Sequence, residues 1–169
     1  TRYSRQISLP EIGEGGQEKL HKARVLIVGA GGLGSPAALY LAGAGVGTIG
    51  LADDDTVGIS NLQRQILYTE NEVGQLKVHC AAQRLRALNG NIEVHVYPFR
   101  LNRENARRLI ADYDIVVDGC DNFSTRYLIS DSCSALHKPY VYGAIQGFEG
   151  QVSVFCYGDR PRTYRDLFP

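Results

Sequence analysis

The chain has 169 residues, which is enough for one domain with a sizeable core and too few for two comfortable ones. Its 18 Lys and Arg residues balance 18 Asp and Glu residues, so net charge gives no sign of a nucleic acid or membrane-surface partner. No apolar stretch approaches a membrane span, and four widely spaced cysteines favour free thiols, so we expect a cytoplasmic protein with no membrane partner.

Strand-like and helix-like segments alternate along the chain, which predicts a mostly parallel sheet covered by helices on both faces. The first 23 residues precede this core as an N-terminal arm (2–6) and a short helix (14–22). The expected strands are 24–28, 48–52, 92–97 and 115–117, with helices at 35–44, 74–89, 104–111 and 125–136. Two late strands, 140–142 and 151–155, extend the sheet, and the whole chain reads as one domain.

A glycine-rich turn follows the first expected strand. Gly29, Gly31 and Gly34 have the G-x-G-x-x-G spacing, and a helix follows at once. Glycines at these places permit a tight turn, close approach of the backbone to a phosphate and close helix–strand packing. The unpaired N–H groups at the start of that helix favour an anion. The turn therefore indicates a nucleotide-binding, Rossmann-like α/β fold.

Charged residues after the second strand narrow the choice of nucleotide. Asp53 ends that strand at the distance expected of an acid that binds ribose hydroxyls, which a dinucleotide enzyme needs equally. Asp54 and Asp55 are open to interpretation as turn residues. Arg64 lies just beyond, and Lys77 opens the next helix. Two converging cations suit a triphosphate under attack better than hydride transfer, because charge developing on phosphoryl groups needs fixed cations.

The strand at 115–117 leads directly into acidic residues. Ligands of open α/β sheets lie beyond the carboxyl ends of the strands, so we expect Asp118 and Asp121 to face the same crevice as the glycine turn. A carboxylate there can hold Mg²⁺ against phosphate oxygens or orient an attacking acid. Asn122 beside them is equally suited to capping the next helix.

Taken together, these motifs resemble those of the MoeB/ThiF/HesA family of ubiquitin-activating-enzyme-like adenylyltransferases, ThiF and MoeB most of all. The matching segments are Arg2-Tyr3-x-Arg5-Gln6, Gly29-x-Gly31-Gly32-Leu33-Gly34, Asp53-x-Asp55, Ser60-Asn61-Leu62-Gln63-Arg64-Gln65, Gly74-x-x-Lys77 and Asp118-x-x-Asp121-Asn122. The resemblance spans almost the whole chain. It implies a single ATP-binding adenylation domain that uses ATP and Mg²⁺ to adenylate the C-terminal Gly-Gly carboxylate of a ubiquitin-like sulfur carrier in thiamin or molybdenum-cofactor synthesis.

By the same resemblance, Arg5, Arg64, Lys77 and Asp121 are the catalytic residues, and Asp121 also binds Mg²⁺. Arg5 would reach the phosphates of a neighbouring subunit, which implies a homodimer. The nucleotide-binding residues would be Gly29, Gly31, Gly32, Gly34, Asp53, Asp55, Ser60, Asn61, Leu62, Gln63, Arg64, Lys77, Asp121 and Asn122.

Two features depart from the family pattern. Thr163 and Asp166 stand where many members carry a C-x-x-C pair, so we expect no structural zinc site. The family also usually continues past the position of Pro169 with a loop bearing a reactive cysteine, so we expect the chain to lack the family's C-terminal portion. The four cysteines are interpreted as small buried hydrophobes. Three alternatives stay open: a related ligase for another peptide or carboxylate, a non-catalytic nucleotide-binding subunit, and a less fitting NAD-dependent oxidoreductase.

Overall fold

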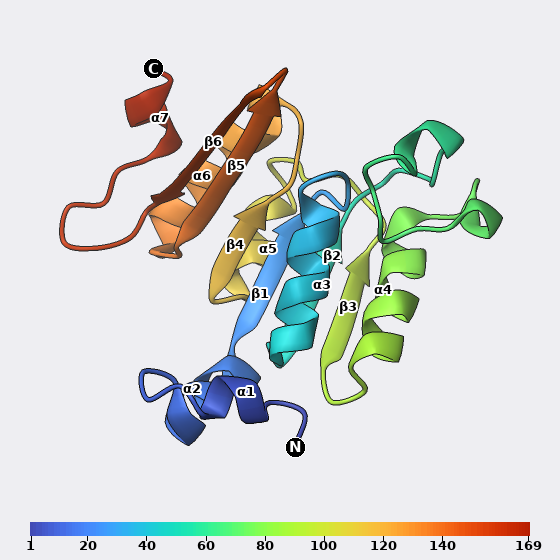
Figure 1. The fold of residues 1–169 in the computed structure, drawn as a ribbon. Coiled ribbons are helices and arrows are strands. Elements are labelled where there is room, and N and C mark those ends of the chain that lie inside the picture. Colours follow the sequence, from blue (N-terminus) through green and yellow to red (C-terminus); the bar gives the residue numbers. More distant parts are fainter.

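Figure 1 shows the computed structural model, which describes all of residues 1–169. Six strands form one sheet in the order β3-β2-β1-β4-β5-β6, parallel throughout except for the last pair, β5 and β6. The strands are β1 (Arg24–Val28), β2 (Thr48–Ala52), β3 (Glu93–Tyr97), β4 (Ile115–Asp118), β5 (Tyr140–Gln146) and β6 (Glu149–Phe155). This is the doubly wound, Rossmann-like α/β arrangement that the sequence predicts, with the late strands extending the sheet.

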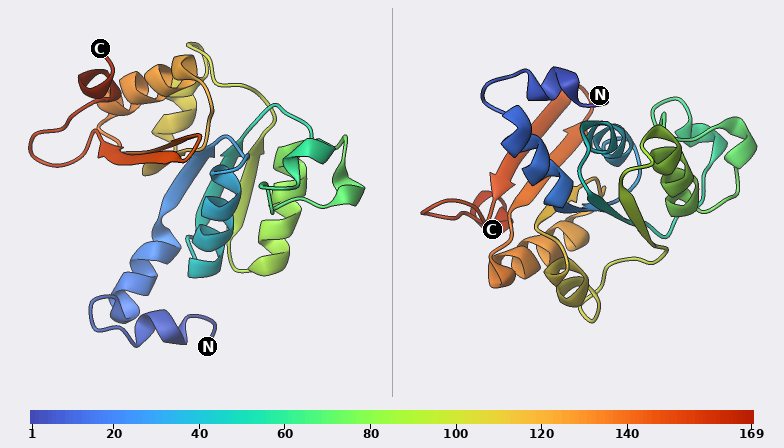
Figure 2. Two further views of the ribbon diagram at one scale, coloured as in Figure 1. Left: turned by 45° about the horizontal axis from the view of Figure 1, so that its top comes forward. Right: turned by 90° about the horizontal axis from the view of Figure 1, so that it is seen from below.

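Helices cover both faces of the sheet (Figure 2). They are α1 (Ser4–Ile7), α2 (Gly13–Lys22), α3 (Gly34–Ala44), α4 (Lys77–Leu88), α5 (Ala106–Ala111), α6 (Phe123–Leu136) and α7 (Tyr164–Leu167), with 3₁₀ turns at Ile59–Asn61 and Glu70–Glu72. None of these helices combines the length and the apolar character that a bilayer crossing needs.

The central strand β1 shows why two helical layers form. Val25 and Ile27 pack into the core under α3 and α4, whereas Leu26 and Val28 pack into the core under α5 and α6. Successive side chains of a strand point to opposite faces, so an uninterrupted apolar run requires cover on both sides. The apolar run of β1 therefore dictates a buried central strand.

Three glycines allow the β1–α3 turn to lie against the segment that follows β4. Gly29 has a φ of +91°, and a Cβ there would come within 2.6 Å of the Gly119 carbonyl oxygen. A Cβ on Gly34 would clash with the Gly29 carbonyl oxygen. The sequence predicts the first two positions, and the structure adds Gly119 as their counterpart. The contact brings the carboxyl ends of β1 and β4 together.

The N-terminal arm is ordered and packs against the rest of the chain. Tyr3 packs on Gly45, and its hydroxyl accepts a hydrogen bond of 2.7 Å from the amide of Asn89. Gln6 and Gln17 both donate to the Ala44 carbonyl oxygen. The Tyr3 ring is therefore a structural anchor that holds the arm in place. The arm lies at the end of the sheet opposite the glycine turn (Figure 1).

Several boundary differences lie at helix starts. The helix predicted from residue 74 begins at Lys77, because Thr56 and Leu76 form an antiparallel bridge that keeps the preceding residues extended. Conversely, α6 begins two residues early at Phe123, with the Asn122 side chain accepting from the Thr125 N–H as its N-cap. Both late strands are longer than predicted, since β5 and β6 form a continuous hairpin.

Candidate functional site

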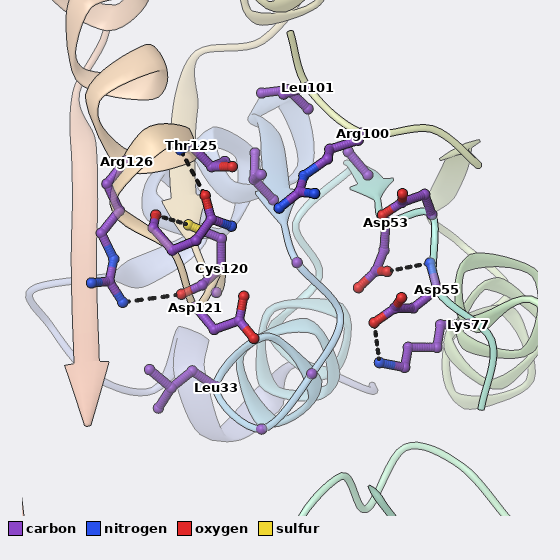
Figure 3. Close-up of a pocket in the computed structure, with 18 of the residues that line it drawn as sticks. Leu33, Asp53, Asp55, Lys77, Arg100, Leu101, Cys120, Asp121, Thr125 and Arg126 are labelled. Carbon is purple, nitrogen blue, oxygen red and sulfur yellow. Dashed lines mark hydrogen bonds and ion pairs between the residues drawn. The ribbon is translucent and has the colours of Figure 1, made fainter. Parts of the chain in front are cut away.

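A cavity of about 560 Å³ opens at the carboxyl ends of the parallel strands, where the order reverses between β1 and β4. Ligands of doubly wound folds bind at such a switch point. Its wall combines the glycine turn, the residues after β2, β3 and β4, and the starts of α4 and α6 (Figure 3). Of the predicted site residues, the cavity brings together Gly29, Gly31, Gly32, Asp53, Asp55, Arg64, Lys77, Asp121 and Asn122.

The glycine turn is fixed on one side and open on the other. Asp53 Oδ2 accepts a hydrogen bond from the Ala30 N–H at 2.8 Å, and its Oδ1 accepts from the Asp55 N–H. A Cβ at Gly31 would meet only the end of the Gln65 side chain, at 3.5 Å, so the space in front of this residue is free for a ligand. Asp53 thus holds the turn as well as lining the cavity, and its carboxylate oxygens retain lone pairs for further donors.

Arg64 and Lys77 place two cations beside this turn. The Arg64 side chain lies against Gly32, and its Nη1 donates to the Ser60 carbonyl oxygen at 3.2 Å. Lys77 is buried and pairs with the exposed Asp55 carboxylate, 3.2 Å from Nζ to Oδ2. Its backbone N–H also donates to the Asp55 carbonyl oxygen, so the first residue of α4 is tied to the segment after β2. Both predicted cations therefore line the same cavity, and their contacts with nucleotide stay predictions.

The two acids after β4 have different surroundings. Asp121 lines the cavity, and no hydrogen bond or ion pair engages its carboxylate. Asp118 is buried outside the cavity, where it accepts from the Tyr140 hydroxyl at 2.6 Å and from the Cys120 N–H at 2.8 Å. Burial raises the pKa of Asp118 despite these donors. The prediction that Asp118 faces the crevice is therefore wrong.

Strand alternation explains the misplacement of Asp118. It is the last residue of β4 and shares a face with Val116, which packs into the core under α6. Asn122 caps α6 and also lines the cavity, and its contact with nucleotide stays a prediction.

Several cavity residues carry no signal in the motifs. Phe99, Arg100 and Leu101 come from the loop after β3, and Ala144 and Ile145 from β5. Gln65, which ends the motif that begins at Ser60 but was not among the predicted binding residues, also lines the cavity; it is buried, and its Oε1 has no hydrogen-bond partner in the chain. Residues 99–101 lie just after the carboxyl end of the predicted strand 92–97, and this position is the signal that would have indicated them.

Arg126 of α6 completes the wall on the β4 side. It donates to the Cys120 carbonyl oxygen at 3.3 Å and lies over the rings of Phe123 and Tyr142. Its Nε is 3.9 Å from Asp118 Oδ2. The arginine therefore supports the segment that carries Asp121.

Five predicted binding residues lie outside the cavity wall together with Arg5. Asn61 closes the first 3₁₀ turn, with its Oδ1 accepting from the Gly58 N–H at 2.8 Å, and Gly34 is buried under the glycine turn. The other three are Ser60, Leu62 and Gln63. Arg5 is exposed in α1, at the far end of the sheet. Their contacts with nucleotide stay predictions.

The four cysteines differ in their burial. Cys80, Cys133 and Cys156 are buried as expected, whereas Cys120 is partly exposed at the cavity wall. Burial raises the pKa of Cys120, with the neighbouring Asp118 charge adding to the effect.

The C-terminal turn carries Thr163 and Asp166 at the positions where many family members have a C-x-x-C pair. Thr163 donates from both its N–H and its hydroxyl to the Asp166 carboxylate, which caps α7.

The sequence model of the ThiF family matches residues 3–169. This chain belongs to the ThiF family. It is 51% identical over 172 residues to the sulfur carrier protein adenylyltransferase of Thermus thermophilus and 52% identical over 167 residues to a probable molybdopterin-synthase adenylyltransferase of Porphyra purpurea. Each alignment covers 99% of this chain but only 64% and 44% of those relatives, so the chain spans about half to two thirds of their length.

Solved structures share the fold of this chain. PaaA, solved as the SeMet protein, superposes with a TM-score of 0.85 at 27% identity, covering 98% of this chain and 53% of that chain. E. coli MccB, solved with ATP, superposes with a TM-score of 0.77 at 30% identity, covering 85% and 45%. The Rossmann-like architecture is therefore shared along nearly the whole chain.

Proposed function

We propose that the chain is the ATP-binding adenylation domain of an adenylyltransferase that activates a ubiquitin-like sulfur-carrier protein for molybdenum-cofactor or thiamin synthesis. The observation that carries this proposal is the meeting of Arg64, Lys77 and Asp121 around one open glycine turn. The names of the Thermus and Porphyra relatives support the same activity. A site for hydride transfer does not require two cations and an unpaired carboxylate beside the glycine turn.

The proposed reaction joins the carrier's C-terminal glycine carboxylate to AMP. A carboxylate oxygen attacks the α-phosphorus of ATP, a new P–O bond forms, and the bond to the pyrophosphate oxygen breaks as pyrophosphate leaves. Negative charge accumulates on the phosphoryl oxygens as this happens. Fixed cations stabilise such charge more than they stabilise the ground state. Lys77, held in place by Asp55, and Arg64, beside Gly32, are the cations in reach of the turn.

The cavity also suits Mg²⁺. Asp121 offers a carboxylate that no protein group engages, on the side of the turn opposite Lys77. Oxygen ligands from one or two carboxylates plus substrate phosphates are typical of Mg²⁺ in nucleotide sites. When bound there, the ion would neutralise charge on the triphosphate. Asp53, with its oxygens facing backbone donors, fits the proposed ribose contact better than a metal role.

A homodimer is the second part of the proposal. Arg5 lies in α1 at the end of the sheet away from the cavity of its own chain, so any phosphate contact by Arg5 has to be made with a neighbouring subunit. The arm is held firmly by Tyr3 and Gln6, which gives Arg5 a fixed starting position. This arrangement supports a role for Arg5 across a dimer interface.

Carrier-dependent exchange of labelled pyrophosphate into ATP tests the activity. We expect exchange with a ubiquitin-fold protein ending in Gly-Gly and none with the same carrier lacking those glycines. Asp121→Ala and Lys77→Ala should abolish exchange, while Lys19→Ala, an exposed lysine of α2, serves as the matched control. Exchange with another peptide or carboxylate in place of the carrier would favour a related ligase. ATP binding without exchange would indicate a nucleotide-binding subunit.

A further inference from the structure

The loop after β3 contributes a cation to the cavity that none of the motifs includes. Figure 3 shows the Arg100 side chain entering from this loop, with its guanidinium directed toward the middle of the cavity above Asp53. No hydrogen bond or ion pair engages the guanidinium. An arginine that is aimed into a cavity and lacks an acidic partner is available to a ligand.

The backbone that carries Arg100 is rigidly placed. The Asn105 amide donates to the Arg100 carbonyl oxygen at 3.1 Å. Asn102 and Asn105 each accept a backbone N–H of the other residue, at 2.9 and 3.0 Å, which closes the turn. Leu101 next to Arg100 is buried in the core under α5. The loop therefore presents the guanidinium from a fixed point, and little further ordering is needed for a contact.

The strand order indicates which part of a nucleotide Arg100 would meet. The glycine turn after β1 marks the phosphates, and Asp53 after β2 marks the ribose, so the base lies further along the same edge, toward the loop after β3. Phe99 and Leu101 add apolar wall at this end of the cavity. A flat base needs such a wall and a flat partner above it. The planar guanidinium of arginine stacks on aromatic faces, which an ammonium does not.

We propose that Arg100 is a nucleotide-binding residue that stacks its guanidinium on the adenine base. The inference rests on the proposed function, because it takes ATP as the ligand of this cavity. It adds a contact to the base that the phosphate-binding residues do not make. Within the loop after β3, Arg100 lines the cavity, whereas Arg103 is exposed and does not.

Calorimetric affinities for AMP, ADP and ATP test this assignment. Arg100→Ala should weaken all three by the same factor, roughly three- to thirtyfold, which is the range of a cation–π contact from a partly exposed to a desolvated site. Arg100→Lys should recover little of the loss, because the charge is kept but the plane is not. Arg103→Ala, the matched control, should bind like the parent chain.

Each result has a separate meaning. A loss that grows from AMP to ATP and is restored by Arg100→Lys would overturn base stacking in favour of a phosphate contact. Unchanged affinities in Arg100→Ala, with the parent chain binding ATP, would overturn any role of Arg100 and leave the proposed function intact. A parent chain that binds no adenine nucleotide would overturn the proposed function itself. Circular dichroism of Arg100→Ala keeps a folding defect from being mistaken for a binding loss.

Discussion

Removal of the Tyr140 hydroxyl tests the buried network behind the cavity. Tyr140 is fully buried and donates to Asp118 Oδ2 at 2.6 Å. Tyr140→Phe keeps the ring but leaves that oxygen with Arg126 alone, at 3.9 Å. A hydrogen bond to a charged group contributes ~1.5–3 kcal/mol to stability. At about 2–4 °C per kcal/mol for a chain of this size, the melting temperature should fall by roughly 3–12 °C.

The loss of stability in Tyr140→Phe should depend on pH. Burial raises the pKa of Asp118, so between its unfolded and folded pKa the native state binds more protons than the unfolded state, and stability falls as pH rises. The Tyr140 hydrogen bond lowers the pKa of Asp118, and its removal raises that pKa further. The deficit of Tyr140→Phe should therefore grow as the pH rises through the folded pKa of Asp118 and the carboxyl loses its proton. It should shrink on acidification, as the carboxyl becomes protonated.

Denaturant unfolding of the parent chain and the variant at about pH 7.5 and about pH 5 measures both effects. Tyr142→Phe is the matched control on the same strand, since its hydroxyl faces the neutral amide oxygen of Gln151 at 3.2 Å. It should cost ~0.5–1.5 kcal/mol at both pH values. An equal, pH-independent loss in the two variants would refute the view that Asp118 is a buried carboxylate held by Tyr140.

Three further changes probe the turn, the arm and the dimer. Gly34→Ala should destabilise the fold, because the new Cβ would clash with the backbone. Gly31→Ala should melt at the same temperature as the parent chain but bind ATP more weakly. Equal melting temperatures of the two variants would contradict the structural role given to Gly34. Tyr3→Phe removes a hydroxyl that accepts from a buried amide and should speed proteolysis of the arm, at a cost of ~1 kcal/mol by denaturant unfolding; unchanged proteolysis would show that the anchor is dispensable. Mixed dimers of Arg5→Ala and Lys77→Ala subunits should recover part of the adenylation activity, and verified mixed dimers without any would argue against Arg5 acting across subunits.

Periodicity was sufficient to predict the layers of this fold. Apolar runs such as Val25–Val28 specify a strand buried on both faces, and the glycine spacing after it specifies a tight turn. What periodicity does not contain is the partner of each element. The hydrogen bond between Tyr3 and Asn89 joins residues 86 positions apart, and the need for glycine at position 119 arises only when the β1 turn packs against it.

The candidate site was predicted in part for the same reason. Arg64 and Lys77 were placed correctly because their positions after a strand and at a helix start bring both to one edge of the sheet. Asp118 was misplaced although strand alternation assigns it to the core side, while Asp121, beyond the strand, is free to face the cavity. Arg100 lies outside every motif, and its position after the carboxyl end of a predicted strand is the signal that could have indicated it.

Intact-mass spectrometry of the carrier shows directly whether the chain adenylates it. A ubiquitin-fold protein ending in Gly-Gly is incubated with the chain, ATP and Mg²⁺, and its mass is measured before and after treatment with hydroxylamine. We expect a carrier that is heavier by one adenylyl group and that loses this group on treatment with hydroxylamine. The Lys77→Ala variant should not form this adduct. A carrier that gains a phosphoryl group instead, or stays unmodified while the chain binds ATP, would contradict the proposed adenylation.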